Sequence, residues 1–301
     1  MTLSISLWQS AIINSNKMTD ITAIILTKNE EVNIARCIKS LNGVVDRICV
    51  VDSGSTDRTL EIAKKFGAEI FHHEPFNHYA SQFNWALDNV GVKTTWVYRI
   101  DADEMVTPEL GAEIVDACEK HHDDDINGFV MKFLIVFMGT YLKHGGMYPF
   151  YNLTIFKFGK GRYENRAMGE HVILNEGKTI ELSNNCIHYD FKSLDAWIIK
   201  HNWYATREVS DYYNTRSIGQ TNPDNLYNEA RKSSKLRDKI YYKMPKFLRA
   251  KLYFWYRYYL KLGFLDGKAG YVHAFLQAYW FRFLVDAKIL EREIRENNEN
   301  V

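Results

Sequence analysis

Two short acidic segments carry residue types that bind cations and nucleotides. The first is residues 52–57, Asp-Ser-Gly-Ser-Thr-Asp, and the second is residues 101–104, Asp-Ala-Asp-Glu. In an extended chain Asp101 and Asp103 are two residues apart and point to the same side. Carboxylate oxygens suit a hard divalent cation, which also binds phosphate oxygens. An isolated Asp-x-Asp is more often a solvated turn. Whether residues 101–103 bind a cation therefore depends on the secondary structure elements that position them.

Each acidic segment directly follows an apolar run that predicts a buried strand. Residues 47–51 and 95–100 precede the two segments, and Ile21–Thr27 is a third run of the same kind. Continuous β-branched runs are typical of strands buried on both faces of a parallel sheet. Because ligands of such sheets bind at the carboxyl ends of the strands, we expect both acidic loops to open onto one edge.

Strands and helices alternate through the first 120 residues. The patterns predict strands over residues 21–27, 47–51, 68–71 and 95–100, and helices over residues 34–43, 59–66, 79–89 and 108–120. This order predicts an α/β fold with a mostly parallel sheet flanked by helices. Strand patterns over residues 128–137 and 153–158, with glycine-rich connections, predict antiparallel additions. The chain after residue 194 reads mainly as helix.

Three segments occur in an order and spacing that resemble a known enzyme family. They are Ile25-Leu26-Thr27-Lys28-Asn29-Glu30-Glu31, Val50-Val51-Asp52-Ser53-Gly54-Ser55-Thr56-Asp57 and Ile100-Asp101-Ala102-Asp103-Glu104. Together they resemble the three successive motifs of family 2 inverting glycosyltransferases. That resemblance covers roughly residues 21–172 and implies the Rossmann-like GT-A fold. The family commonly has a second aspartate after the one matched by Asp52, where this chain has Ser53.

The resemblance also implies a nucleotide-sugar site and a metal. The site would consist of Thr27, Asn29, Glu30, Glu31, Asp52, Asp101, Ala102 and Asp103. In the family's pattern Asp52 contacts the base, and Asp101 meets the ribose or the diphosphate. Asp103, with Asp101, would hold Mn²⁺ or Mg²⁺, which offsets charge on the departing diphosphate. The implied reaction transfers a sugar from a UDP- or GDP-sugar to a hydroxyl of a glycan or lipid-linked glycan.

An inverting transfer also needs a base that removes the proton of the acceptor hydroxyl. Glu170 lies in Gly169-Glu170-His171-Val172, between a polar stretch and an apolar run, and similar enzymes carry a Glu-His pair near this place. Our hypothesis is that Glu170 is the base; the alternative is an ordinary surface glutamate. His171 would orient this base or approach the metal, although a structural role is the commoner one for a single histidine.

Residues 240–290 combine cations with aromatic side chains. They contain nine Lys or Arg residues and two acids, Asp266 and Asp286. Helices that lie in a membrane surface have this composition, which predicts peripheral contact with an anionic membrane. The alternative is an aromatic helical pair packed on the catalytic domain. Residues 263–270 would form the bend between the two helices, and residues 145–149 read as a flexible segment near the acceptor.

The amino-acid composition limits the possible class and location of the protein. The chain has 301 residues and 46% hydrophobic content, enough for a large core, and no uncharged apolar run long enough to span a membrane. Its 38 Lys and Arg residues nearly balance 37 Asp and Glu residues, so a nucleic-acid partner is not indicated. Four scattered cysteines without a CxxC pair favour a reducing cytoplasm. The cationic aromatic segment, together with the family resemblance, predicts a position at the inner face of the cell membrane. We predict a flexible extension (1–19), a catalytic domain (20–190) and a mainly helical acceptor and membrane-surface region (191–301).

Two other functions compete with sugar transfer. A nucleotidyltransferase acting on sugar phosphates also uses a parallel sheet and an acidic metal site, but usually has a glycine-rich basic loop after its first strand. Here that place holds Thr27-Lys28-Asn29-Glu30-Glu31. The non-enzyme alternative is a catalytically dead module that binds nucleotide sugar at a membrane surface. It predicts binding without turnover, and the intact Asp101 and Asp103 argue against it.

Overall fold

The chain forms two compact units, described here from a computed structural model. The described residues are 19–74, 78–164, 171–189, 192–218 and 241–299. Unit 1 consists of Met1–Lys132, Asn152–Tyr163 and Leu174–Ile187, and unit 2 of Phe133–Tyr151, Glu164–Ile173 and His188–Val301. Of the predicted extension (1–19), residues 1–18 lie outside the described part of the chain.

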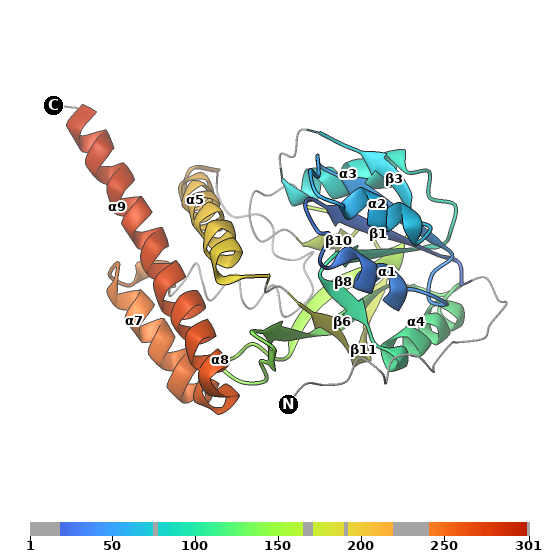
Figure 1. Ribbon diagram of the computed structural model, residues 1–301. Coiled ribbons are helices and arrows are strands. Elements are labelled where there is room, and N and C mark those ends of the chain that lie inside the picture. The colour runs from blue at the N-terminus through green and yellow to red at the C-terminus, as the bar shows by residue number, and fades with distance from the viewer. Residues whose placement is uncertain (1–18, 75–77, 165–170, 190–191, 219–240, 300–301) are drawn as a thin grey trace. The chain divides into compact units, whose positions relative to one another are not determined.

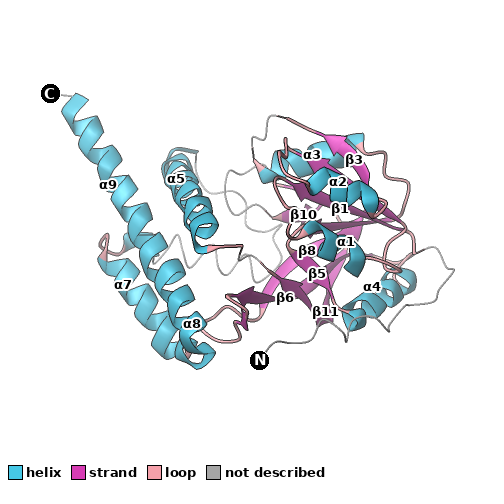
Figure 2. Cartoon of the chain, in the orientation of Figure 1, coloured by secondary structure: helices cyan, strands magenta, loops and turns pink. Residues whose placement is uncertain are grey.

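Four parallel strands form one half of the sheet. They are β1 (Ile21–Thr27), β2 (Arg47–Asp52), β3 (Glu69–His72) and β4 (Trp96–Asp101), in the order β3-β2-β1-β4. All seven residues of β1 are buried, which agrees with its unbroken apolar sequence. Strands β2 and β4 pair in parallel with β1 on its two sides (Figure 2). The predicted α/β fold with a mostly parallel core is therefore confirmed.

The other half of the sheet contains the predicted antiparallel additions. β8 (Phe150–Lys157) pairs antiparallel with β4, and the sheet continues through β6 (Ile126–Phe137), β11 (Lys178–His188) and β5 (Glu104–Val106). β7 (Thr140–Tyr141) pairs with the end of β6. β9 (Gly161–Tyr163) and β10 (Val172–Leu174) form a separate two-stranded sheet.

Four helices belong to the parallel part of unit 1 (Figure 1). They are α1 (Ile34–Ser40), α2 (Thr59–Lys65), α3 (Tyr79–Asn89) and α4 (Pro108–Lys120). α4 begins where the sequence predicts, because Thr107 accepts a hydrogen bond from the backbone N–H of Leu110 and Pro108 occupies the first helical turn. The start of α3 is capped in the same way by His78, which accepts from Ser81.

Unit 2 is mainly helical, as the sequence predicts. Its helical elements are α5 (Leu194–Ile218), η3 (Tyr241–Lys243), α7 (Leu248–Trp255), η4 (Tyr256–Leu260), η5 (Gly263–Asp266), α8 (Gly267–His273), η6 (Ala274–Trp280) and α9 (Phe281–Glu299). The turns η4 and η6 are π-helical. α5 packs on α9 through a core that includes Ala205, Val209 and Val285, and α7 runs beside η6 and α9 (Figure 1). Among the described residues, no helix has the length and apolarity needed to cross a membrane.

The bend between α7 and α8 is shorter than the predicted one (263–270). The turn ends at Asp266, and Gly267 to Gly270 already belong to α8. A side chain at Gly270 would collide with the carbonyl oxygen of Gly263, so this glycine permits close packing inside a helix. At the start of the segment predicted to be flexible (145–149), the Gly145 N–H donates to the carbonyl of Lys261 at 2.7 Å, and the Gly145 carbonyl accepts from Arg257. The flexibility of residues 146–149 stays a prediction.

Asp266 holds the same segment from the other side of the bend. Its carboxylate accepts from the backbone N–H of His144 at 2.9 Å and lies 2.6 Å from Nδ1 of the same residue. The Asp266 side chain is almost completely buried by these contacts. Together with the two bonds of Gly145, they clamp residues 143–145 onto the bend of unit 2.

Candidate active site

The two acidic loops open onto one edge of the sheet. In the strand registers Thr27 lies opposite Asp52, and Leu26 lies opposite Asp101. Asp52 and Asp101 are thus the last residues of β2 and β4, on either side of the end of β1. The prediction that these loops share the carboxyl edge of the parallel strands is confirmed.

Asp52 organises the loop that follows it. One carboxylate oxygen accepts from the hydroxyls of Thr27 at 3.1 Å and Ser55 at 2.5 Å, and the other from the N–H groups of Gly54 and Ser55, both at 2.9 Å. The side chain is buried. Because both oxygens already accept two hydrogen bonds within the protein, Asp52 shapes the loop, and its contact with a base stays a prediction.

The loop after β1 is bonded to the loop after β2. The side chain of Asn29, which has a left-handed backbone, accepts from the N–H of Thr56 at 2.8 Å. The Glu30 N–H donates to the hydroxyl of Thr59 at 2.7 Å, and the Glu31 N–H donates to Asp57 at 3.1 Å. The sequence-predicted residues Asn29, Glu30 and Glu31 are therefore placed by the same loop that Asp52 holds.

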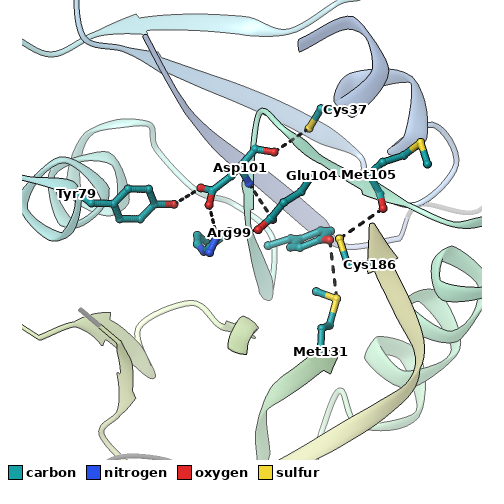
Figure 3. A network of polar contacts seen from close by, with 9 residues as sticks. Cys37, Tyr79, Arg99, Asp101, Glu104, Met105, Met131 and Cys186 are labelled. Atoms are coloured by element: carbon teal, nitrogen blue, oxygen red, sulfur yellow. Dashed lines mark hydrogen bonds and ion pairs between the residues drawn. The ribbon is translucent and has the colours of Figure 1, made fainter. Parts of the chain in front are cut away.

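Asp101 is fixed by two donors (Figure 3). The Tyr79 hydroxyl, from the first turn of α3, donates to Oδ1 at 2.5 Å, and Nη1 of Arg99 lies 2.9 Å from Oδ2. Burial raises the pKa of Tyr79 well above its ordinary value, so the hydroxyl remains a donor near neutral pH. The carboxylate of Asp101 therefore has one orientation before any ligand arrives.

Arg99 and Glu104 each contact Asp101, and they also contact one another. Arg99 is buried and contacts Glu104 at 3.5 Å as well as Asp101. Burial alone would lower the pKa of Arg99, but the neighbouring carboxylates, chiefly that of Asp101, outweigh it and raise the pKa well above the ordinary value. The sequence patterns did not predict Tyr79, Arg99 or Glu104 as site residues. Arg99 gave a usable signal, because an arginine inside a buried strand needs an acidic partner.

The segment after β4 is a turn and not an extended strand. Ala102 and Asp103 form the turn between β4 and β5, and Glu104 closes it by accepting from the N–H of Asp101 at 3.0 Å. The expectation that Asp101 and Asp103 extend to the same side of a strand is therefore wrong. Ala102 is buried and Asp103 is half-buried, at the carboxyl edge of the sheet.

Thiols lie close to this network without taking part in its chemistry (Figure 3). Sγ of Cys37 donates to the carbonyl of Asp101, and Sγ of Cys186 to the carbonyl of Met105, both at 3.4 Å. Burial raises the pKa of both thiols well above the ordinary value. They are packing groups beneath the site and not nucleophiles at neutral pH.

Two sequence-predicted residues come from the chain between β9 and β10. Glu170, the hypothetical base, lies outside the described residues. His171 precedes β10 in unit 2, is half-buried, and its carbonyl accepts from the N–H of Glu164 at 3.0 Å. The roles of Glu170 and His171 stay predictions.

A divalent cation fits the chemistry of the Asp103 turn. Over the described ranges, no group of three or more His, Cys, Asp or Glu side chains is arranged to hold a metal. Mg²⁺ and similar cations are commonly bound by one or two carboxylates, with substrate phosphates and waters as the other ligands. The half-buried carboxylate of Asp103 is a donor of this kind, so a full protein cage is not required.

Comparison with known proteins identifies the class. Residues 22–171 match the family described as Glycosyl transferase family 2. An uncharacterized glycosyltransferase of Rickettsia prowazekii is 31% identical over 64% of this chain and 68% of that protein. LpsC of Rhizobium meliloti, a lipopolysaccharide core biosynthesis glycosyltransferase, is 30% identical over 62% and 69% of the two chains. These matches define a glycosyltransferase. The chain belongs to glycosyl transferase family 2.

The sequence similarity to one relative extends beyond the family segment. An uncharacterized glycosyltransferase of Rickettsia typhi is 28% identical over 93% of this chain and 90% of that protein. Among solved structures, residues 1–349 of S. aureus TarS align with 92% of this chain and 91% of that chain, at 14% identity and a TM-score of 0.42. Family membership supports the GT-A type of α/β fold, and it leaves the nucleotidyltransferase alternative without support.

Proposed function

We propose that this glycosyltransferase moves a sugar from a UDP- or GDP-sugar to a hydroxyl of a glycan or lipid-linked glycan at the inner face of the cell membrane. The proposal rests on one observation: the carboxylate of Asp101 is held in place at the carboxyl edge of the parallel strands. The contacts of Asn29 with Thr56 and of Glu30 with Thr59 lie at the same edge. A preorganised acceptor of hydrogen bonds at this edge supports binding of a ribose or a metal-bound diphosphate.

The proposed roles follow the chemistry of each group. Asp103 would hold Mn²⁺ or Mg²⁺, and such a cation would offset the negative charge of the leaving diphosphate. Asp101, oriented by Tyr79 and Arg99, binds the nucleotide part of the donor. Glu170 accepts the proton of the attacking hydroxyl. A lipopolysaccharide-type acceptor is supported by the similarity to LpsC, whose name assigns it to lipopolysaccharide core biosynthesis.

The proposal is tested by incubating the purified chain with UDP-, GDP- and dTDP-sugars and Mn²⁺ or Mg²⁺, and measuring release of nucleoside diphosphate. We expect slow release from one donor, its loss on adding a chelator, and its stimulation by a lipid-linked glycan acceptor. A donor that binds without any release, with acceptor present, would favour the catalytically dead module. Absence of binding by every donor would contradict the proposal.

A further inference from the structure

Helix α7 and the following turn η4 carry large apolar side chains that face solvent. Counted from Leu248, these side chains stand at i, i+4, i+7, i+8, i+11 and i+12, a spacing that places them along one side of a helix. They are Leu248, Leu252, Trp255, Tyr256, Tyr259 and Leu260, each between 42% and 57% exposed. In a water-soluble helix such a row normally packs on a core, so its exposure calls for a partner.

The bend continues this apolar surface. Leu262, Phe264 and Leu265 are also exposed, and they follow Leu260 directly in the chain. Leu262 has a left-handed backbone, with φ of 59°, a conformation that favours glycine or asparagine. Backbone preference and solvent exposure both disfavour leucine at this position, which is nevertheless a leucine.

The exposed charges on the same elements are all positive. Lys251, Lys261 and Lys268 are exposed. The single acid between residues 248 and 273 is Asp266, whose side chain is buried against His144. Arg249 and Arg257 are buried and bonded within unit 2. Within residues 248–273, the exposed charged side chains are therefore lysines, and the one carboxylate is buried.

We infer that these nine apolar residues and three lysines form a docking surface for an anionic lipid membrane. Aromatic and aliphatic side chains at the headgroup level, flanked by lysines, are the combination that holds a helix in the plane of a membrane surface. The lysines complement anionic headgroups, and the leucines and Trp255 enter the boundary of the acyl chains. The inference goes beyond the transfer reaction, because it depends on none of the groups at the carboxyl edge of β1, β2 and β4.

Vesicle sedimentation with the full chain tests the charge component. We expect binding to phosphatidylcholine vesicles that contain about 30% phosphatidylglycerol, weaker binding without the anionic lipid, and weaker binding in high salt. Replacing Lys251, Lys261 and Lys268 together by Gln should lower the partition coefficient on the order of 100-fold, at about fivefold per lysine. The matched control replaces Lys64, Lys93 and Lys120 by Gln, which changes the net charge equally on exposed positions of unit 1.

A second pair of variants tests the apolar component. Leu260→Ser with Leu265→Ser removes two exposed side chains near the bend, and Ile199→Ser with Ile294→Ser removes two exposed side chains of α5 and α9. Only the first pair should reduce vesicle binding, by about tenfold or more. Equal losses in both pairs, equal losses in both lysine triples, or no binding by the unmodified chain would overturn the inference.

Two further measurements separate this inference from its alternatives. If the surface joins two copies of the chain, the unmodified protein will be a dimer that Leu260→Ser with Leu265→Ser dissociates, and vesicles will not bind it; that result would also overturn the inference. Donor hydrolysis in solution should be unchanged in the lysine triple. If the proposed transfer reaction is not observed, vesicle binding can still be measured and still decides this inference.

Discussion

The hydroxyl of Tyr79 donates a 2.5 Å hydrogen bond to Oδ1 of Asp101, although 22 residues separate them in the chain. The first turn of α3 thereby fixes the last residue of β4. Arg99 holds the other oxygen of the same carboxylate at 2.9 Å. The conformation of this carboxylate is set by two donors from different elements, so each donor can be tested alone.

Replacing Tyr79 by Phe should raise the dissociation constant for the donor nucleotide by about tenfold or more. A hydrogen bond to a charged group contributes about 1.5–3 kcal/mol, and its loss frees one rotation of the Asp101 carboxylate. Isothermal titration with the nucleoside diphosphate and Mn²⁺ measures the change. Tyr98→Phe is the matched control, because this buried tyrosine of β4 has its hydroxyl 3.9 Å from the sulfur of Met131. Equal effects of the two substitutions would contradict a positioning role for Tyr79.

Asp103→Asn should reduce donor hydrolysis on the order of 100-fold or more, because an amide removes the anionic ligand that we propose for Mn²⁺ or Mg²⁺. The metal concentration at half-maximal rate should rise as well. Asp88→Asn is the control, since Asp88 is an exposed aspartate of α3 paired with Arg162 at 2.7 Å. A variant at Asp103 with normal rate and normal metal dependence would remove this residue from the metal site.

Asp286→Ala should lower the free energy of unfolding by about 3–5 kcal/mol, because it leaves the buried guanidinium of Arg249 without its partner. Both side chains are buried, and Asp286 also accepts from the N–H of Phe247 at 2.6 Å, where α7 begins. Urea unfolding followed by circular dichroism measures the loss. Glu291→Gln breaks an exposed pair with Arg295 in α9 and should cost less than about 0.5 kcal/mol. A small effect at Asp286 would mean that the ion pair is not a stabilising contact.

Stability should fall as the pH is lowered from about 6.5 towards 4. Burial, with Arg257 and His201 nearby, lowers the pKa of His273 to about 3. Below the ordinary pKa the unfolded chain binds a proton that the folded chain does not, so this group contributes a loss of up to about 1.4 kcal/mol per pH unit. His273→Gln cannot take up this proton, and its stability profile between pH 7 and 5 should be flatter. Parallel profiles for the two proteins would refute the assignment.

Local pattern predicted the parallel part of the fold well. β1, α3 and α4 have the predicted limits, because an unbroken apolar run, a helical stripe and the Thr107-Pro108 cap each act over a few neighbouring residues. The turn at Ala102 and Asp103 was missed because it depends on the side chain of Glu104 folding back to the N–H of Asp101. Tyr79 was missed for a similar reason, since its contact with Asp101 exists only after α3 has packed on the sheet.

The clamp at Asp266 has a consequence for biosynthesis. It joins the backbone of His144 to a residue that the ribosome adds 122 positions later. The parallel strands β1 to β4 are complete once residue 101 has been made. In unit 2, by contrast, residues 133–151 are made long before the bend that holds residues 143–145. Contacts of such long sequence separation form slowly and late. A nascent chain stopped before residue 257 will therefore contain the parallel strands β1 to β4 but will lack every partner that Gly145 and His144 have in this clamp.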